Sequence, residues 1–281
     1  MKALVLEGGS HRGIYTAGVL DILLENNITF DAVYGVSAGS LSALSFLSGQ
    51  PGRTARISFD YIHDPRYMSE KNLTETGDYF GFQFLMGELS QQLVPLDFEA
   101  LKRNPTKFYA VTAELETGEA AFLEKSETDI LKAAVASSSL PIIALPKEIN
   151  GVKYMDGGLV CPIPFQKAME DGADKVLVVT TRERGFRKRE KPEEQVHKEQ
   201  EHYKDYPKFA KLLTKTVEIY NHQLDDLDLL TESGKVFVIS PKGPVEIESQ
   251  ERDVSKLKAL YEEGRRDASE QLDAIKKYLN L

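Results

Sequence analysis

A single serine, Ser37, lies between two glycines where a short apolar run ends. Residues 30–45 read FDAVYGVSAGSLSALS and contain the pattern Gly35-Val36-Ser37-Ala38-Gly39. Gly-x-Ser-x-Gly is typical of a nucleophile elbow, in which the serine occupies a sharp turn between a strand and a helix. The glycines let neighbouring chain pass close by, and the helix N-terminus favours developing negative charge. The pattern predicts a nucleophilic serine; the alternative is a tight turn built of small residues.

A second candidate, Asp156, lies at the end of a predicted strand in the sequence YMDGGL. Two glycines follow it, Gly157 and Gly158, and leave room for another segment to approach. A carboxylate within hydrogen-bond reach of Ser37 can take the hydroxyl proton directly. Asp-Gly is also a common turn sequence, so a purely structural turn is the alternative.

Histidine is the usual base beside a serine nucleophile, and the chain has five histidines: His11, His63, His197, His202 and His222. In a common α/β-hydrolase the elbow lies deep in the chain and is followed by an acid and then a histidine, whereas Ser37 comes directly after the second predicted strand. His197 and His202 lie in a highly charged segment, His222 lies next to the polar stripe of a long predicted helix, and His63 lies in an irregular segment, so none has the position of a triad base. We expect all five to lie on the surface. A histidine-dependent triad using His63 or His222 is the alternative.

The sequence EGGSHRG, residues 7–13, follows the first predicted strand and begins the first predicted helix. Backbone N–H groups of Gly8, Gly9 and Ser10 can converge on an oxyanion, and Arg12 can hold a phosphate or carboxylate. A nucleotide phosphate loop is the competing interpretation, but the spacing differs from G-x-G-x-x-G and no Gly-Lys-Ser/Thr is present. Because the carboxyl ends of parallel strands meet at one edge of a sheet, this loop and the elbow should open together.

Taken together, the three motifs resemble those of the patatin-like phospholipases, which are lipid acyl hydrolases. The family pattern is Gly-Gly-Gly-x-Arg/Lys-Gly, then Gly-x-Ser-x-Gly, then Asp-Gly-Gly/Ala. Here the matching stretches end at Gly13, Gly39 and Gly158, in the same order, and AVASSSLPIIALP at 134–146 resembles the segment before the family's aspartate. The resemblance extends from residue 2 to about 180.

The resemblance implies a three-layer α/β/α fold around a mainly parallel sheet. It also implies a Ser37–Asp156 dyad without histidine, an oxyanion hole formed by the loop at residues 8–10, and ester hydrolysis through an acyl-serine, with no metal or cofactor. The sequence departs from the family at Ser10, which stands in place of the third glycine. If that position needs a positive φ, serine costs roughly 1 kcal/mol there, while its N–H is retained.

Periodicity predicts the elements that position these motifs. We expect strands in residues 2–6, 30–35, 107–115, 119–124 and 174–181, a hairpin turning at Asn150-Gly151, and a last strand at 235–241. We expect helices at 13–25, 38–48, 129–140 and 163–173, an amphipathic helix from 209 to about 230, and a C-terminal helix at about 253–279. Strand–helix alternation at this spacing indicates one α/β domain over residues 1–281.

Two further segments are less regular. Residues 61–86 are rich in Tyr, Phe and Met and predict either a lid or acyl groove, or simply core. Residues 182–207 are almost entirely charged and predict a mobile, solvated excursion. Within it, residues 182–191 carry six basic and two acidic side chains, which either contact phospholipid head groups or form a surface loop.

Composition limits the partners. The net charge of −9 makes nucleic-acid binding and purely electrostatic membrane adsorption unexpected, so a membrane would be at most a transient surface. Cys161 is the only cysteine, and the N-terminus lacks the apolar length of a signal peptide, so we expect a cytoplasmic bacterial protein. The sequence leaves oligomeric state open. It predicts a phospholipase A-like lipid acyl hydrolase, with a small-ester esterase or thioesterase, or a non-catalytic lipid-binding relative, as alternatives.

Overall fold

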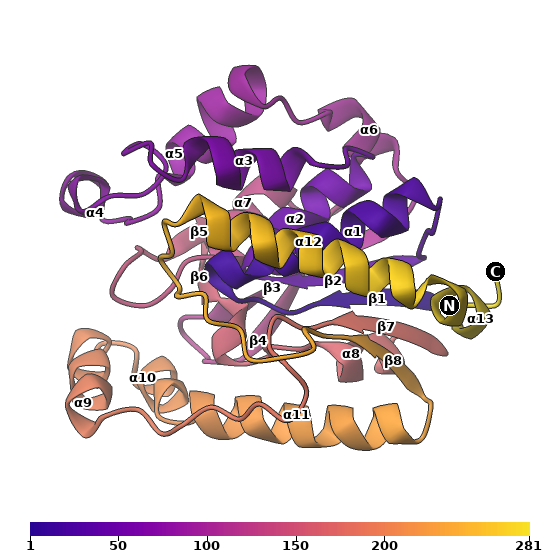
Figure 1. The fold of residues 1–281 in the computed structure, drawn as a ribbon. Coiled ribbons are helices and arrows are strands. Elements are labelled where there is room, and N and C mark those ends of the chain that lie inside the picture. Colours follow the sequence, from indigo (N-terminus) through magenta and orange to yellow (C-terminus); the bar gives the residue numbers. More distant parts are fainter.

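A computed structural model describes residues 1–281, and its eight strands form one mixed sheet (Figure 1). The strand order is β5–β6–β3–β2–β1–β7–β8. β2 and β6 pair with one edge of β3, and β4 pairs with the other edge. The strands are β1 (Lys2–Leu6), β2 (Ala32–Val36), β3 (Lys107–Glu114), β4 (Ala120–Glu124), β5 (Lys147–Ile149), β6 (Val152–Asp156), β7 (Lys175–Val179) and β8 (Val236–Ile239).

Five strands, β3, β2, β1, β7 and β8, are parallel to one another and form the centre of the sheet. Their sequences are nearly continuous apolar runs, such as KALVL and AVYGV, because both of their faces are covered. β4 and β6 pair antiparallel with β3, and β5 pairs antiparallel with β6. The predicted hairpin is confirmed, with Asn150 and Gly151 both at positive φ in its turn.

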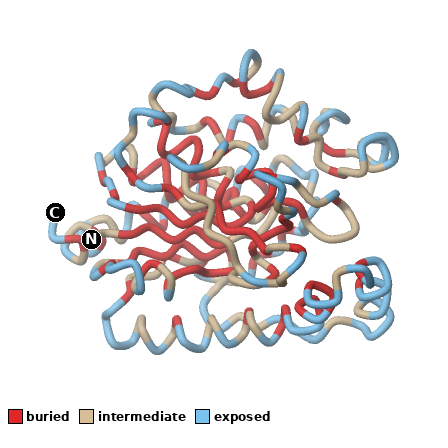
Figure 2. The backbone as a smooth tube through the Cα atoms, turned by 180° about the vertical axis from the view of Figure 1, so that it is seen from behind, coloured by how far each residue is buried: buried red, intermediate tan, exposed pale blue.

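Helices cover both faces of the sheet, which confirms the three-layer α/β/α fold (Figure 1). One face packs against α1 (Gly13–Glu25), α2 (Ala38–Leu47) and α12 (Val254–Glu270), in a cluster that contains Leu4 and Leu6. The opposite face packs against α8 (Phe165–Glu170) and α11 (Thr216–Glu232), in a cluster that contains Ala3 and Val5. The alternation of β1 side chains between the two clusters is the period of a strand, and Figure 2 shows the buried centre that results.

The remaining helices lie around this sandwich. They are η1 (Ser10–Arg12), α3 (Arg53–Tyr61), α4 (Glu70–Thr76), α5 (Phe82–Phe84), the π-helix η2 (Leu85–Leu93), α6 (Phe98–Arg103), α7 (Ile130–Ser137), η3 (Gly157–Leu159), α9 (Glu193–His202), α10 (Pro207–Leu213) and α13 (Leu272–Tyr278). No helix has both the length and the apolar character needed to cross a membrane.

Two predicted helices are each divided in the structure. The C-terminal helix consists of α12 and α13, because Gln271 leaves helical geometry (φ −98°, ψ 3°) while its side chain donates a hydrogen bond to Asp267 O. The amphipathic helix consists of α10 and α11, which are separated at Thr214 and Lys215; the Thr214 hydroxyl bonds the carbonyl of Lys211. Side-chain bonds to the last carbonyls compete with continuation of a helix.

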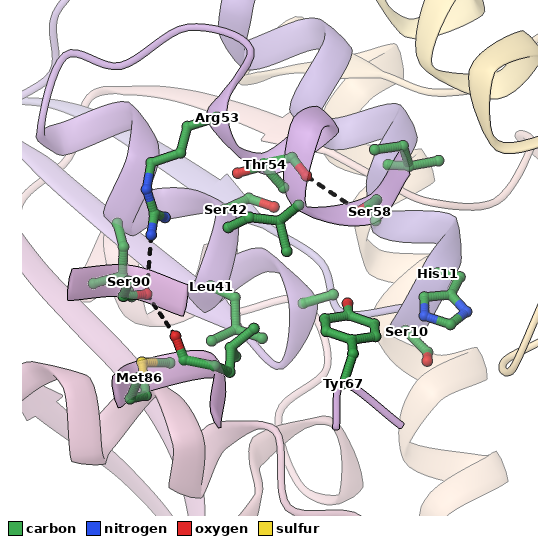
Figure 3. Close-up of a pocket in the computed structure, with 16 residues that line it drawn as sticks. Ser10, His11, Leu41, Ser42, Arg53, Thr54, Ser58, Tyr67, Met86 and Ser90 are labelled. Carbon is green, nitrogen blue, oxygen red and sulfur yellow. Dashed lines mark hydrogen bonds between the residues drawn. The ribbon is translucent and has the colours of Figure 1, made fainter. Parts of the chain in front are cut away.

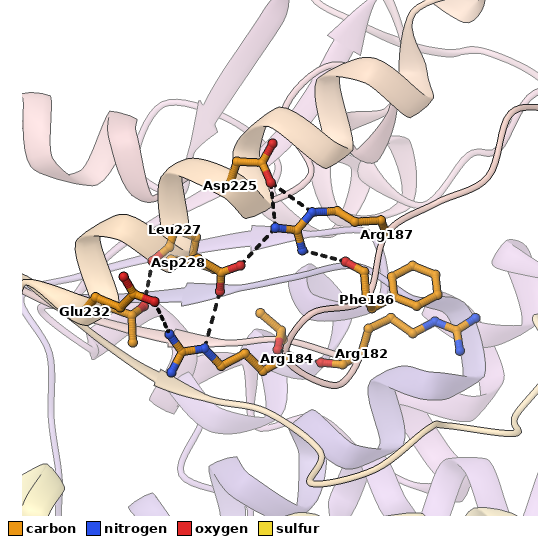
Figure 4. Close-up of polar contacts among 10 residues, drawn as sticks. Arg182, Arg184, Phe186, Arg187, Asp225, Leu227, Asp228 and Glu232 are labelled. Carbon is orange, nitrogen blue, oxygen red and sulfur yellow. Dashed lines mark hydrogen bonds and ion pairs between the residues drawn. The ribbon is translucent and has the colours of Figure 1, made fainter.

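The charged segment 182–207 contains the helix α9, which the sequence did not predict. Its first part runs along α11 and is attached to it by ion pairs, including Arg187 with Asp225 (2.6 Å) and Asp228 (2.9 Å) (Figure 4). These pairs determine where the segment lies relative to the edge of the sheet.

Candidate active site

Ser37 occupies the turn between β2 and α2 with a strained backbone. Its φ is 52° and its ψ is −124°, a positive-φ conformation that a residue with a Cβ rarely adopts. The side chain is 8% exposed and stands at the N-terminal end of α2. The structure therefore has the strand–turn–helix context that a nucleophile elbow requires.

The glycines of the elbow leave space for neighbouring backbone. A Cβ at Gly39 would lie 2.6 Å from Leu6 O, and one at Gly35 would lie 2.7 Å from the Ser40 Cα. Real Cβ atoms do not approach other atoms so closely, so the elbow could not pack in this way with alanine at either position. Gly13 likewise allows the start of α1 to pack closely against α2, because a Cβ at this position would lie 2.8 Å from the Ala38 Cβ.

The pairing of β3 brings Asp156 to Ser37. Val36, the last residue of β2, pairs with Val111, and Asp156, the last residue of β6, pairs with the next residue of β3, Thr112. β4 occupies the other edge of β3, so β2 and β6 follow one another along the same edge. The end of β6 therefore lies beside the end of β2, and Ser37 and Asp156 line the same cavity.

Asp156 is 2% exposed, and its Oδ1 accepts a hydrogen bond from Gly158 N at 2.7 Å. Burial raises the pKa of Asp156 to about 6, against lowering contributions from the Ser37 side chain, the Gly158 N–H and the charge of Lys188. The Ser37 side chain is thus near the carboxyl group, although Oδ2 has no partner with full hydrogen-bond geometry. A carboxyl group with a pKa near neutrality is suited to accepting and returning a proton.

The serine-rich segment at the C-terminal end of α7 holds both residues in place. The Ser137 hydroxyl accepts a hydrogen bond from Ser37 N (2.8 Å), and the carbonyl of Ser139 accepts one from Asp156 N (2.9 Å). The sequence analysis did not assign a role to Ser137. The signal available was the run of three serines directly before Pro141, which is unusual at the end of an apolar helix.

The loop after β1 lies against the elbow. A Cβ at Gly8 would lie 2.9 Å from the Ser37 Cβ, so only glycine allows this approach. The backbone N–H groups of Gly8, Gly9 and Ser10 donate to no acceptor within the protein. Ser10 has a φ of 51°, so the position does require the left-handed conformation, and the predicted strain of serine there is present.

A buried polar network supports this loop from behind. Glu7 accepts hydrogen bonds from Tyr220 Oη (2.6 Å) and Thr181 N (2.6 Å). The Thr181 hydroxyl lies 2.8 Å from Gly8 O, and a Cβ at Gly9 would collide with it at 2.5 Å. The sequence analysis missed Glu7, Thr181 and Tyr220, which lie directly after β1, shortly after β7, and in α11.

Two kinds of cavity meet at Ser37. A polar cavity of about 520 Å³ contains Ser37, Asp156 and the loop at residues 8–10, together with Arg12 and several other charged side chains. A small apolar pocket on the other side is formed by Ala38, Leu41, Phe80, Phe82, Leu85 and Leu140, beside Ser37 itself. A second small pocket shares Leu41 and Tyr67 with it and extends between α2 and α3 to Met86 (Figure 3).

The segment 61–86 contributes both to the core and to the walls of the apolar pockets. Met68 and Tyr79 belong to the main core, whereas Tyr67, Phe80 and Met86 line the apolar pockets.

The prediction that all histidines lie on the surface is wrong for His11, which is 7% exposed. Its ring packs against Tyr67 and Phe80, with centroids 6.4 and 6.0 Å away. Burial lowers its pKa to about 4, and neither ring nitrogen has a hydrogen-bond partner. His11 is thus neutral and lines the apolar pocket, and it lacks the hydrogen bonds to a serine and an acid that a triad base makes. The other four are exposed: His63, His197, His202 and His222.

Comparison with known proteins places these features in a family. A sequence model described as "Patatin-like phospholipase" matches residues 4–169, which include all three motifs. The chain belongs to the patatin-like phospholipase family. A second model, described as a domain of unknown function (DUF6363), matches residues 206–280 of this patatin-like protein.

Two relatives extend the comparison. The uncharacterized protein YjjU of Escherichia coli strain K12 is 28% identical over 184 residues, which are 64% of this chain and 51% of YjjU. The chain thus spans about half the length of that relative. The crystal structure of VipD from Legionella pneumophila superposes with a TM-score of 0.55 at 13% identity, over 97% of this chain and 67% of VipD. That likeness supports the patatin-like fold alone.

Proposed function

We propose that this patatin-like protein is a serine acyl hydrolase of the phospholipase A type, with Ser37 as nucleophile and Asp156 as its only base. The observation that carries the proposal is the strained Ser37 turn beside a buried carboxyl group whose pKa is raised to about 6. Family membership supports a lipid acyl ester as the substrate.

The reaction follows from these positions. Asp156 accepts the Ser37 proton as the hydroxyl oxygen attacks the acyl carbonyl, and the unpaired N–H groups of Gly8, Gly9 and Ser10 bind the oxyanion. The Ala38 N–H, at the N-terminus of α2, also has no acceptor in the protein and is a further donor. Asp156 then returns the proton to the departing alcohol. Water attacks the acyl-serine with Asp156 again as base, which releases the fatty acid and restores Ser37.

Each of the two cavities suits a different part of the substrate. The apolar pocket beside Ser37 suits the start of an acyl chain, because its walls are Leu41, Phe80, Phe82 and Leu85. The polar cavity on the Asp156 side suits the alcohol that departs. The acyl bond to be broken lies where the two cavities meet.

Active-site labelling and hydrolysis test this proposal together. A fluorophosphonate probe should label the wild-type protein readily, Asp156→Asn slowly or not at all, and Ser37→Ala not at all. Hydrolysis of p-nitrophenyl esters from acetate to palmitate should fall by at least about 10³-fold in both variants. Equal rates in all three proteins would exclude the dyad, and a preference for acetate over longer chains would favour a small-ester esterase.

A further inference from the structure

The polar cavity holds three basic side chains that have no ion-pair partner. Arg12, Arg182 and Lys188 all line it, and none has a carboxylate oxygen within 4.0 Å. Lys191 lines it too, but is paired with Glu199 at 2.7 Å. A net positive cavity in a chain of charge −9 is a local feature that composition does not explain.

The segment that carries two of these residues is held in place by its other basic residues. Arg184 pairs with Asp228 and Glu232, and Arg187 pairs with Asp225 and Asp228, along α11 (Figure 4). The guanidinium group of Arg182 points away from these carboxylates in the same view. The segment thus uses two arginines for attachment and leaves Arg182 facing the cavity.

Lys188 is held against α11 by hydrogen bonds of its backbone to the side chain of Asn221. Its N–H donates to Asn221 Oδ1 (2.8 Å), and its carbonyl accepts from Asn221 Nδ2 (3.0 Å). Lys188 lines the same cavity as Asp156, and its charge opposes the rise that burial causes in the pKa of Asp156. The side chain is therefore directed towards the site where the alcohol departs.

The three cations line one cavity, and the charge of Arg12 interacts with those of Arg182 and Lys188. Burial lowers the pKa of the Arg12 guanidinium, and the nearby charge of Arg182 lowers it further. The Nε of Arg12 is buried without a hydrogen-bond partner. Glu7 and Asp156 line the same cavity, but Glu7 is hydrogen-bonded to Thr181 and Tyr220, and neither carboxylate forms an ion pair with the three cations. Cations held together without ion-pair partners favour an anionic ligand, and arginine forks match the oxygens of a phosphate.

A zwitterionic head group fits this cavity less well. A quaternary ammonium group is bound by open aromatic faces. The two aromatic rings that line the cavity are already covered by cations: Arg182 lies 4.6 Å from the Phe186 ring centroid, and Lys188 lies 3.9 Å from that of Tyr220. A choline group would have to displace one of these side chains.

We propose that Arg12, Arg182 and Lys188 form a subsite for a phosphate carried by the departing glycerol, so that the protein selects anionic over zwitterionic phospholipid head groups. This inference rests on the proposed acyl hydrolase function. It adds the head-group class, which the patatin-like motifs do not specify.

The test uses lipids that differ only in the head group. Palmitoyl-lysophosphatidic acid and palmitoyl-lysophosphatidylcholine, each in non-ionic detergent micelles, are offered as substrates to the wild-type protein and to Lys188→Gln. We expect wild type to prefer the phosphate monoester in kcat/KM by about tenfold or more, and Lys188→Gln to lose most of that preference. The ratio of the two rates is the readout, because any effect of Lys188 on Asp156 applies to both substrates.

Arg189→Gln is the matched control, because Arg189 is the next residue, is exposed and does not line the cavity. It should keep the wild-type ratio, and Lys188→Arg should restore most of it. Equal hydrolysis of the two lipids by wild type, or an unchanged ratio in Lys188→Gln, would overturn the subsite. Faster cleavage of palmitoyl-CoA than of lysophosphatidic acid would reject the glycerol leaving group. If wild type cleaves no p-nitrophenyl ester, the acyl hydrolase proposal itself fails.

Discussion

The hydroxyl of Ser137 accepts a hydrogen bond from the backbone N–H of Ser37 at 2.8 Å and donates one to Val111 O at 2.6 Å. It therefore connects the strained elbow to β3, the strand along which Asp156 is also placed. All of these groups are buried, so no water replaces the bond when it is lost.

Ser137→Ala should therefore loosen the elbow. Leaving the Ser37 N–H without an acceptor should lower the free energy of unfolding by about 1–3 kcal/mol. A small displacement of the nucleophile should also reduce kcat by roughly tenfold or more. Denaturant unfolding and p-nitrophenyl ester kinetics measure the two effects. Ser48→Ala, which removes a buried hydroxyl at the far end of α2, should leave kcat unchanged; equal loss in both variants would argue against a specific role for Ser137.

The activity should depend on pH through Asp156. Because the base must be ionised and burial raises the pKa of Asp156 to about 6, kcat/KM should rise with pH around a midpoint near 6 and then level off. The measurement is a pH–rate profile from pH 4.5 to 8 with a p-nitrophenyl ester. Far-UV circular dichroism over the same range checks that folding is constant. A midpoint near the ordinary aspartate value of about 4 would contradict Asp156 as the base.

The same carboxyl group should reduce stability at neutral pH. Its pKa is higher in the folded state than its ordinary value of 3.8, so the folded protein binds more protons and stability falls as the pH rises from about 4 to 6. Asp156→Asn removes the buried charge and should be more stable than wild type at pH 7, by on the order of 2 kcal/mol, with the difference shrinking towards pH 4.

Asp171→Asn should change stability at neutral pH in the opposite direction to Asp156→Asn. Although burial raises the pKa of Asp171, bonds from Lys167 and Tyr34 outweigh it and lower that pKa, so its stabilisation is present at neutral pH and is lost as pH falls. The Asn variant at 171 should be less stable than wild type at pH 7. Thermal unfolding of both variants at pH 4 and pH 7 is the measurement, and a destabilised Asp156→Asn at pH 7 would contradict the interpretation that burial makes the ionised Asp156 carboxylate unfavourable.

Two substitutions of Ser10 should distinguish the effect of its side-chain hydrogen bond on stability from the effect of its positive φ. Both Ser10→Ala and Ser10→Gly lose the hydrogen bond from the Ser10 hydroxyl to Ser249 O (2.5 Å), but only glycine adopts a φ of 51° without strain. The glycine variant should be more stable than the alanine variant by about 1 kcal/mol, as measured by urea unfolding. Equal stabilities would mean that the loop relaxes to negative φ when the hydroxyl is absent.

Much of the fold could be predicted from local sequence. The apolar runs of β1, β2 and β7, the Asn150-Gly151 turn and the helix after Ser37 all follow from patterns within about ten residues. The helix divisions at Lys215 and Gln271 could not be predicted, because they depend on bonds and packing that apolar periodicity does not encode. His11 was misplaced for a similar reason: only the fold brings Tyr67 and Phe80 over its ring.

The sequence by itself determined the chemistry available: a serine between glycines, a carboxylate before two glycines, and a glycine loop after the first strand. Those signals are local, because they reflect the backbone angles and close approaches that each turn requires. The tertiary structure decided which groups meet. It is the pairing of β2 and β6 along one edge of β3 that brings Asp156 beside Ser37, and the docking of α11 that brings Tyr220 to Glu7. These contacts join segments far apart in the chain, so they depend on how the whole sheet is assembled.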